Sequence, residues 1–397
     1  MRIISAFLML VFFVSAIPAI AQDSRTQYPR VLSKAYIAVD IGYINYNFSN
    51  AELNPGFKTE NIGVPHTAVR ITLFGYRFNK YLATELNYMR PVLWVRYHDI
   101  NGAPYDLPVY MNLATVVLKP RIPIGKKFSL NGEFGLAVIT RKGMDIDGTV
   151  VMNDASYVSV SVGGGFYYHL NKKWDLGLHA SYSPSNHSVP QPATSFYSVG
   201  FKYNMHPLPE EVVKRNAESK YIFPRNLVQI GFATNEFGYE VNDFFSKGSV
   251  PVFWGGNAHV ASGISVHYQR NIFHTRKVFS LDWGSSVSFW KSQQSDEKFF
   301  TFSLYPLLRF TLIRTKPLDV YLNYSVAGPS YISRTTIDSM QTGKEFTFQD
   351  FMGMGMYAGK KRKFNFEMRI AHYSNGNLFP DNDGVKVPLS FNVGLSF

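Results

Sequence analysis

The feature that most constrains this chain is an alternation of apolar and polar residues with a period of two. Residues two apart on a β-strand point to the same face, so each alternating segment has one apolar and one polar face. A transmembrane β-barrel requires this pattern, because lipid surrounds its outside and its interior is polar, although a soluble β-sandwich shows it too. The clearest example ends the chain, with apolar residues at Val387, Leu389, Phe391, Val393, Leu395 and Phe397.

The lengths of the connections distinguish between these two folds. Short connections such as 359–362 alternate with long ones such as 375–386. Short periplasmic turns and long external loops are typical of outer-membrane barrels, whereas a sandwich has no reason to alternate them. The sixteen alternating segments lie near 35–48, 67–78, 80–95, 109–120, 127–140, 155–169, 173–184, 195–204, 227–239, 258–271, 277–290, 298–312, 318–328, 346–358, 363–374 and 387–397.

Each half of the chain has eight such segments, which are enough to close one small barrel. The predicted fold class is therefore all-β, with two tandem eight-stranded antiparallel outer-membrane β-barrels at 30–204 and 226–397. Residues 205–225 contain three prolines and a polar centre that can form one short helix, which indicates a periplasmic linker. The alternative is a single 16-stranded barrel in which 205–225 is an oversized turn.

The N-terminus carries the features of an export signal. Arg2 gives a positive start, residues 3–17 are apolar, and 19–21 form a small-x-small cleavage site. This pattern predicts a secretory signal peptide over 1–21; the alternative is an N-terminal membrane anchor. An exported barrel belongs in the outer membrane of a Gram-negative cell. Because Phe397 resembles the C-terminal aromatic residue of barrels handled by the outer-membrane barrel assembly machinery, we expect that machinery as a partner.

The composition excludes several other classes of protein. Charged residues make up 17% of the chain and aromatic residues 16%, which is too aromatic and too poor in charge for a disordered protein. There is no cysteine, and the ten histidines show no HExxH spacing, so we expect no disulfide and no metal site. The net charge of +12 favours the anionic phosphates of lipid A and the outer-membrane lipids as partners over nucleic acid.

Two polar residues interrupt an apolar face near the C-terminus. On the segment 363–374, His372 and Ser374 share the parity of Phe366 and Met368, so both should point outward into lipid. Polar side chains in that position are costly unless they have a function, and the pair is close enough for the base–nucleophile contact that activates a serine. With both termini periplasmic, the pair lies at the outer leaflet, where lipopolysaccharide holds its acyl esters. This placement predicts acyl-ester hydrolysis.

The hairpin register supplies a candidate for an orienting acid. Folding the chain at its short turn near 359–362 pairs Ala358 with Phe364 and, in the same register, Asp350 with His372. Directly opposed residues have Cβ atoms ~5 Å apart, so Asp350 can orient the imidazole as the acid of a serine triad does. The alternative is an interfacial aspartate that extends toward solvent.

At this point the sequence resembles a known family. The string HYSN at 372–375, followed by NDG at 382–384 and a final amphipathic strand, is similar to the outer-membrane lipid A 3-O-deacylases (PagL) of the acyloxyacyl hydrolase group. The resemblance covers about residues 226–397. It implies a serine-hydrolase mechanism without cofactor, with His372 as base, Ser374 as nucleophile and Asn375 as a residue associated with oxyanion stabilisation. The turn that includes Gly376 can supply further donors to a tetrahedral oxyanion.

The chain departs from this family at the position of the triad acid. The family has a glutamate two residues after the NDG string, and Lys386 stands there. Either Asp350, Asp381 or Asp383 substitutes for that glutamate, or the enzyme works as a dyad, or activity is lost. Loss of the orienting acid in a serine triad can cost ~10⁴ in rate.

Two functions therefore compete. The first is an outer-membrane esterase that removes an ester-linked acyl chain from lipid A, with Ser374 attacking and His372 moving the proton. The second is a non-catalytic barrel with a structural, adhesive or lipid-binding role, and Lys386 is its best support. The first half of the chain carries no comparable constellation, and we interpret it as a structural or lipid-contacting barrel.

Overall fold

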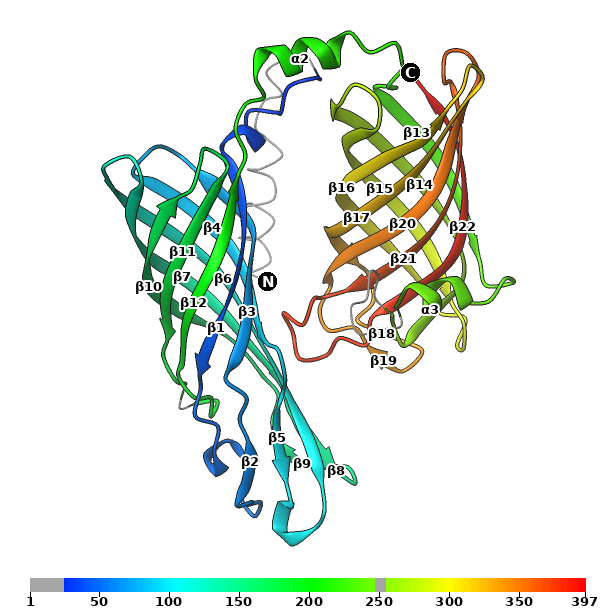
Figure 1. The fold of residues 1–397 in the computed structure, drawn as a ribbon. Coiled ribbons are helices and arrows are strands. Elements are labelled where there is room, and N and C mark those ends of the chain that lie inside the picture. The colour runs from blue at the N-terminus through cyan, green and yellow to red at the C-terminus, as the bar shows by residue number, and fades with distance from the viewer. Residues whose placement is uncertain (1–24, 187, 247–254) are drawn as a thin grey trace.

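Two closed eight-stranded barrels make up the computed structural model, which describes residues 25–186, 188–246 and 255–397 (Figure 1). The predicted fold class is confirmed, and the alternative of one 16-stranded barrel is wrong because each set of eight strands closes on itself. The predicted signal peptide at 1–21 lies outside the described residues. Within the described ranges, no helix is long and apolar enough to cross a membrane.

The first barrel has an antiparallel wall in which strand order follows chain order. Strand β12 returns to pair with β1 and so closes the wall. Each of the eight strands overlaps a segment that the alternation predicts. They are β1 (Ala35–Asn45), β3 (Thr67–Arg77), β4 (Leu82–Pro91), β6 (Asp106–Ile124), β7 (Phe128–Lys142), β10 (Ala155–His169), β11 (Trp174–Ser183) and β12 (Thr194–Asn204).

The long connections of the first barrel form an extension beyond its wall (Figure 1). The short segments in this extension were not predicted, because three or four residues are too few to show a period. They are η2 (Asn50–Glu52), β2 (Asn61–Gly63), β5 (Val95–His98), η3 (Ile100–Gly102), β8 (Met144–Ile146) and β9 (Thr149–Met152). Ile44, Tyr97, Met111 and Ile139 belong to a buried apolar cluster that joins this extension to the barrel. The first barrel is therefore plugged at this end.

The second barrel repeats the same plan. Strand β13 pairs with both β14 and β22 and closes the wall. The wall strands are β13 (Asn226–Thr234), β14 (Ala258–His274), β15 (Phe279–Ser292), β16 (Lys298–Arg314), β17 (Leu318–Ile332), β20 (Phe346–Ala358), β21 (Phe364–Ser374) and β22 (Val385–Ser396). Its long connections hold helix α3 (Glu240–Ser246) and the hairpin of β18 (Thr336–Ile337) and β19 (Met340–Gln341).

The connection between the barrels contains the short helix that the polar centre of 205–225 predicts, α2 (Glu210–Ala217). Its first turn carries Glu210 and Glu211 and its last turn Lys214 and Arg215, an order of charges that suits the helix dipole. Helix α2 and the short turns of both barrels lie at one end of the molecule, which we call the linker end (Figure 1). The long connections lie at the opposite end, which we call the loop end.

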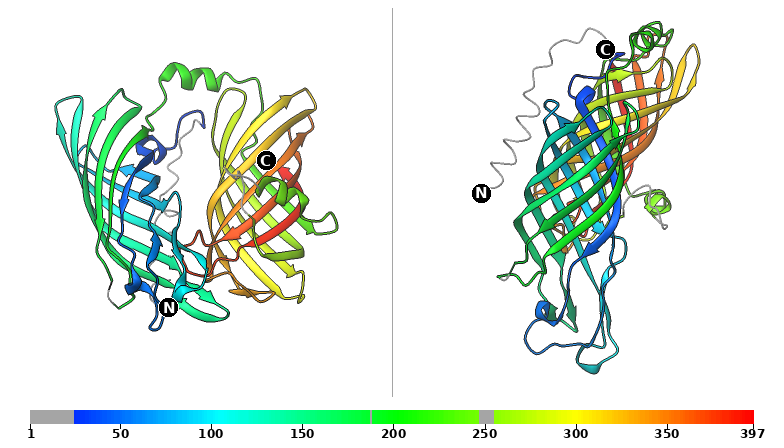
Figure 2. Two further views of the ribbon diagram at one scale, coloured as in Figure 1. Left: turned by 60° about the horizontal axis from the view of Figure 1, so that its bottom comes forward. Right: turned by 60° about the vertical axis from the view of Figure 1, so that its left-hand side comes forward.

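The barrels also touch each other at both ends. At the linker end, the Arg25 guanidinium donates to Asn271 Oδ1 at 2.8 Å, and the Arg25 carbonyl accepts from the His274 amide at 2.8 Å. At the loop end, the connection from β21 to β22 reaches the wall of the first barrel, where the Thr140 hydroxyl donates to the Leu378 carbonyl at 2.9 Å (Figures 1 and 2). The loop that follows the HYSN string therefore belongs to the interface between the barrels.

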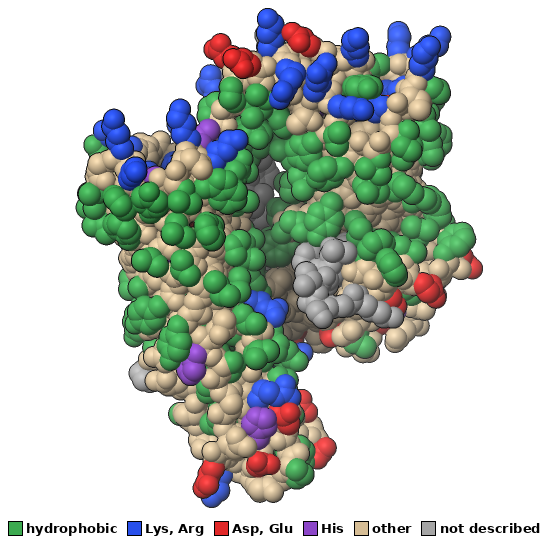
Figure 3. Space-filling model, viewed as in Figure 1, with side chains coloured by type: hydrophobic (Ala, Val, Ile, Leu, Met, Phe, Trp, Pro, Cys, Tyr) green, Lys and Arg blue, Asp and Glu red, His purple; other side chains and the backbone are tan. Residues whose placement is uncertain are grey.

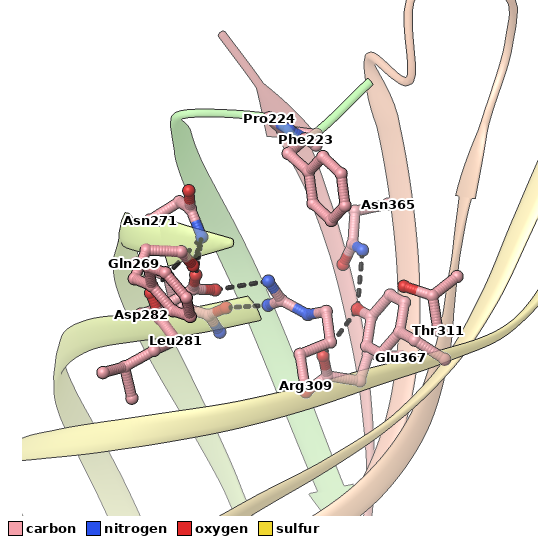
Figure 4. Close-up of polar contacts among 12 residues, drawn as sticks. Phe223, Pro224, Gln269, Asn271, Leu281, Asp282, Arg309, Thr311, Asn365 and Glu367 are labelled. Carbon is pink, nitrogen blue, oxygen red and sulfur yellow. Dashed lines mark hydrogen bonds and ion pairs between the residues drawn. The ribbon is translucent and has the colours of Figure 1, made fainter. Parts of the chain in front are cut away.

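Paired polar side chains fill the barrel interiors. In the second barrel, Arg309 forms an ion pair with Asp282 and donates to Gln269 Oε1 at 2.7 Å (Figure 4). In the first barrel, Arg70 bonds to Asp40 at 3.0 Å and Lys119 to Glu85 at 3.0 Å. Buried ions need such partners because desolvation is expensive. These contacts explain the polar residues at every second position of the strands.

The outer walls carry the apolar half of the alternation. Apolar side chains cover the visible walls of both barrels, and Lys and Arg side chains gather at the linker end (Figure 3). On β21, for example, Phe364, Phe366 and Met368 are exposed on the outside, whereas Asn365 and Glu367 are buried inside. Such a wall suits lipid on the outside of a closed barrel.

Candidate active site

The candidate site lies where β20 and β21 approach the loop end. The two strands pair in the predicted register, with Ala358 opposite Phe364, and Asp350 opposite His372. The short turn at 359–363 and the apolar face of both strands set this register, because a slip of one residue would turn every apolar side chain inward. The backbone therefore brings Asp350 and His372 side by side, two positions from Ser374.

His372 is covered rather than exposed to lipid. It has the outward parity of the exposed Phe366 and Met368, yet only 2% of its surface is accessible. Gly384 lies against it: a Cβ added to Gly384 would be 3.0 Å from His372 Nε2 and 3.3 Å from Gly256 Cα. The expectation that the imidazole faces the lipid is corrected by this cover, which arises because the chain leading into β14 pairs with the start of β22.

Asp350 approaches His372 from the neighbouring strand. Its Oδ2 lies 3.7 Å from His372 Nδ1, and the carboxyl group is buried. The other oxygen, Oδ1, accepts a hydrogen bond of 2.6 Å from the backbone amide of Ala327. Ala327 has φ +52° at an irregularity in β17, so Asp350 also fastens a bulge of the barrel wall. The carboxylate is held in place by this bond and presents its free edge to the imidazole.

Lys386, the departure from the family pattern, stands opposite His372 on the neighbouring strand. It pairs with His372 across β21 and β22. Its ammonium group donates to Asp243 Oδ1 on helix α3 at 2.6 Å. The Asp243 carboxylate therefore pairs with the cation that stands opposite His372 on β22. The sequence did not reveal this partner, because α3 reaches Lys386 from a loop 143 residues away along the chain.

Asn375 and Gly376 begin the connection between β21 and β22, which we call the nucleophile loop (375–384). Asn375 is fully buried, its backbone amide donates to Asn382 Oδ1 at 2.8 Å, and its side-chain amide donates to the carbonyls of Thr342 (3.2 Å) and Asp381. Gly376 has φ +63°, a left-handed conformation that suits glycine. In this conformation the Asn375 donors hold the loop together.

The two alternative acids have other surroundings. Asp383 accepts from Asn257 Nδ2 at 3.0 Å and from the Gln341 amide at 2.7 Å. Asp381 contributes its backbone carbonyl to the Asn375 amide. Asp383 thus ties together three connections at the loop end, whereas Asp350 is the acid that the structure brings to His372.

A further brace supports the nucleophile loop from the hairpin of β18 and β19. Asp338, at the turn of this hairpin, accepts from the Ser292 hydroxyl at 2.6 Å and from the Gln294 and Ser295 amides at 3.0 and 2.8 Å. Burial alone would raise the pKa of Asp338, but these hydrogen bonds outweigh it and lower the pKa below its ordinary value. The hairpin anchored in this way supplies the Gln341 amide that binds Asp383.

The arrangement resembles a serine-hydrolase constellation in its parts. A serine and a histidine lie two apart on one strand, a carboxylate lies on the other side of the histidine, and loops cover the imidazole. In the part of the chain that the structure describes, no group of three or more His, Asp or Glu side chains could hold a metal ion. A serine hydroxyl, an imidazole and a carboxylate can together support proton transfer and nucleophilic attack.

Comparison with known protein families gives two matches, one for each barrel. Residues 6–204 match the family described as outer membrane protein beta-barrel domain. The chain belongs to the outer-membrane β-barrel proteins. Residues 262–396 match the family described as lipid A 3-O-deacylase (PagL), which confirms the resemblance that HYSN and NDG indicate. The second barrel is a PagL-like domain, which includes His372, Ser374 and Lys386 and lies in the outer membrane.

Solved structures of outer-membrane barrels are also similar to this chain, and no curated protein matches it. The crystal structure of the outer membrane enzyme PagL is 15% identical, with 43% of this chain and 99% of that chain covered and a TM-score of 0.31. Neisserial surface protein A (NspA) is 17% identical, with 43% and 97% covered and a TM-score of 0.28. Ail of Yersinia pestis, in complex with a heparin analogue, is 16% identical, with 43% and 98% covered and a TM-score of 0.29.

Proposed function

We propose that the PagL-like barrel is an esterase that hydrolyses an ester-linked acyl chain of lipid A. The observation that carries this proposal is the juxtaposition of Ser374, His372 and Asp350 on the outer wall, at the loop end of the barrel. The match of 262–396 to the lipid A 3-O-deacylase family supports the same substrate class. The loop end is then the external end, and the short turns face the periplasm.

The reaction follows the chemistry of a serine hydrolase. The Ser374 hydroxyl attacks the ester carbonyl and gives its proton to the His372 imidazole. The tetrahedral intermediate collapses, the C–O bond to the sugar breaks, and the imidazolium returns the proton to the departing sugar hydroxyl. Water then attacks the acyl-serine, with His372 again taking and returning a proton, and the free fatty acid leaves.

Asp350 has the role of the orienting acid in this proposal. Its 3.7 Å separation from His372 Nδ1 is longer than a hydrogen bond. Catalytic hydrogen bonds are often long without substrate and shorten in the complex. Because Ala327 already fixes one carboxylate oxygen, the imidazole moves toward Asp350 in this proposal when substrate binds. Oxyanion donors come from the backbone at Asn375 and Gly376, once substrate displaces part of the loop.

Lipid A itself gives the test of this proposal. The purified full-length protein is incubated with lipopolysaccharide, and the lipid A is weighed by mass spectrometry. We expect loss of the mass of one acyl chain with the wild-type protein and no loss with Ser374→Ala. Unchanged lipid A with the wild type, or equal loss with Ser374→Ala, would refute the esterase.

A second candidate function is a non-catalytic lipid-binding barrel. Two observations favour it: the Asn375 amide is engaged by the Thr342 and Asp381 carbonyls, and the expected glutamate is replaced by Lys386 in an ion pair with Asp243. This candidate predicts that lipid A binds to the protein and is recovered with its mass unchanged. The same mass-spectrometric experiment therefore decides between the two functions.

A further inference from the structure

The outer wall of the first barrel has a polar patch at its loop end, formed by Asn112, Thr140 and Ser156. On the same strands, the outward positions nearer the linker end are apolar and exposed, as at Leu136 and Val158. Thr140 and Ser156 are directly opposite each other on β7 and β10. Polar side chains on a lipid-facing wall are costly without partners, so this patch needs an occupant.

The nucleophile loop of the second barrel occupies part of this patch. The Leu378 carbonyl accepts hydrogen bonds from the Thr140 hydroxyl at 2.9 Å and from the Ser156 hydroxyl at 3.2 Å. Thr140 retains only 3% of its surface in contact with solvent. Leu378 lies four residues after Ser374, so the first barrel holds the loop that begins at the proposed nucleophile.

A cleft of about 230 Å³ remains between the loop and the wall. Tyr110, Asn112 and Lys142 line it from the first barrel, and Asn377 and Phe379 from the nucleophile loop. The cleft combines aromatic faces with amide groups and one cation. Such a mixture suits a sugar that carries an anionic group, because rings pack on its faces while polar groups bind its hydroxyls.

Lys142 is the only charged side chain among the residues that line this cleft. It ends β7, points outward with Thr140, and is exposed. Among the residues that the structure describes, no carboxylate lies within 4.0 Å of its ammonium group. An exposed lysine without a protein partner at the rim of a cleft is available to a phosphate.

We propose that this cleft binds the phosphorylated sugar of lipid A, with Lys142 as the partner of a phosphate. The inference rests on the proposed function and adds a substrate subsite that only the two barrels together can form. Asn377 is three positions after Ser374, a span of at most about 10 Å, so the cleft begins close to the proposed nucleophile. One bound lipid can therefore place its sugar phosphate in the cleft and an acyl ester at Ser374.

The test measures binding in the absence of turnover. Full-length Ser374→Ala protein in detergent micelles is titrated by calorimetry with bisphosphorylated lipid A, with dephosphorylated lipid A and with phosphatidylglycerol. Adding Lys142→Gln should weaken binding of bisphosphorylated lipid A about fivefold, as expected for one exposed ion pair, and leave the dephosphorylated form unchanged. Lys127→Gln, at the linker end of the same barrel, is the matched control and should change neither value.

A second variant tests the docked loop. Thr140→Val combined with Ser156→Ala removes both donors to the Leu378 carbonyl and keeps Lys142. It should weaken both forms of lipid A by a similar factor, because the cleft loses one wall while the cation remains. Unchanged binding by this variant would contradict a role of the docked loop in the subsite.

Three results would overturn the inference. In the first, bisphosphorylated lipid A binds equally well with and without Lys142→Gln. In the second, Lys142→Gln weakens binding of the dephosphorylated form as much as that of the bisphosphorylated form. In the third, Lys142→Gln weakens binding of phosphatidylglycerol to the same degree. The last result would assign the cleft to glycerophospholipids. Binding that depends on Lys142 without any deacylation by the wild type would refute the proposed function alone, whereas deacylation with binding independent of Lys142 would refute this inference alone.

Discussion

Both barrels contain a histidine 3.7 Å from an aspartate, but the two pairs lie in opposite places. In the first barrel, His179 Nε2 is 3.7 Å from Asp40 Oδ1 inside the lumen, where Asp40 is also bonded to Arg70. In the second barrel, His372 Nδ1 is 3.7 Å from Asp350 Oδ2 on the outer side of the wall. The same separation therefore occurs in a sealed interior and next to the membrane.

The two pairs differ in the side chains that surround the imidazole. A tyrosine ring, Tyr167, packs on His179 with centroids 4.7 Å apart, and the polar neighbours of His179 belong to a network of paired charges. His372 has Ser374 two residues away on its own strand and the nucleophile loop beside it. A His–Asp distance alone does not make a site; a nucleophile and a path for substrate are also required.

Substitution of the two histidines should give the largest difference in deacylation rate between the two barrels. His372→Asn removes the proposed base, and we expect deacylation to fall by about 10⁴-fold or more, the scale of triad removal. His179→Asn keeps a polar group in the lumen and should leave the rate within about twofold, since His179 lies inside the first barrel and not at the proposed site in the second. Initial rates of acyl release from lipopolysaccharide measure both. Equal rates for the two variants would contradict the assignment of the base.

The two aspartates provide a matched pair with a smaller effect. Asp350→Asn keeps the acceptor for the Ala327 amide but loses the charge that faces His372, so turnover should fall by about 10²- to 10⁴-fold. Asp40→Asn in the first barrel should not lower it. The competing acids Asp381 and Asp383 are tested in the same way.

We expect Asp381→Asn and Asp383→Asn to cost far less turnover than Asp350→Asn, because Asp350 lies 3.7 Å from the imidazole, whereas Asp383 is bound by other loops at the loop end. The measurement is kcat for each variant on the same lipopolysaccharide. A larger loss for Asp383→Asn than for Asp350→Asn would discard Asp350 as the orienting acid.

Substitutions of two glycines in the nucleophile loop can distinguish two causes of lost activity, strain in the backbone and crowding of the imidazole. Gly384 and Gly376 have similar φ values of +68° and +63°. An added Cβ would be 3.0 Å from His372 Nε2 at Gly384, but no closer than 3.5 Å to the Phe348 ring at Gly376. Gly384→Ala should therefore lower activity by up to about 10²-fold, the cost of ~1 Å misplacement, and Gly376→Ala by much less.

Activity and folding are measured together for this pair. An alanine in a left-handed backbone conformation is strained to a similar degree at both positions. Heat-modifiable migration on gels reports the folded barrel. If Gly376→Ala were as inactive as Gly384→Ala with both barrels folded, loop strain rather than contact with the imidazole would explain the loss.

Separation of the barrels should have the smallest effect on folding. Every wall strand of the second barrel pairs within that barrel, so 226–397 with its own signal peptide should insert and migrate as a heat-modifiable species. The cut removes the contact of the first barrel with Leu378, the contact of Arg25 with Asn271, and the packing of Phe223 from the linker on His274, but it removes no strand pairing of the second wall. Failure of this segment to fold would show that the first barrel is needed for more than the cleft.

The sequence predicted what depends on local periodicity. The sixteen wall strands follow from the alternation, and the register that places Asp350 opposite His372 follows from the short turn and the apolar face of the hairpin. The family strings at 372–375 and 382–384 identified the class of the second barrel, because they are contiguous in the chain.

Contacts between distant loops were not predictable in this way. Asp243 reaches Lys386 from α3, Gly384 and the chain before β14 cover His372, and Leu378 docks on Thr140. Each of these contacts joins non-periodic segments whose positions depend on the closed barrels. The sequence therefore suggested candidate catalytic residues but not the contacts that shield or position them.

The most direct measurement of the central claim is reaction of the full-length protein with a fluorophosphonate, followed by mass spectrometry of its peptides. The account predicts one phosphonylated residue, Ser374 in the second barrel, and no adduct in His372→Asn, where the serine lacks its base. An unlabelled Ser374 in the folded wild-type protein, or an adduct on a serine of the first barrel instead, would contradict it.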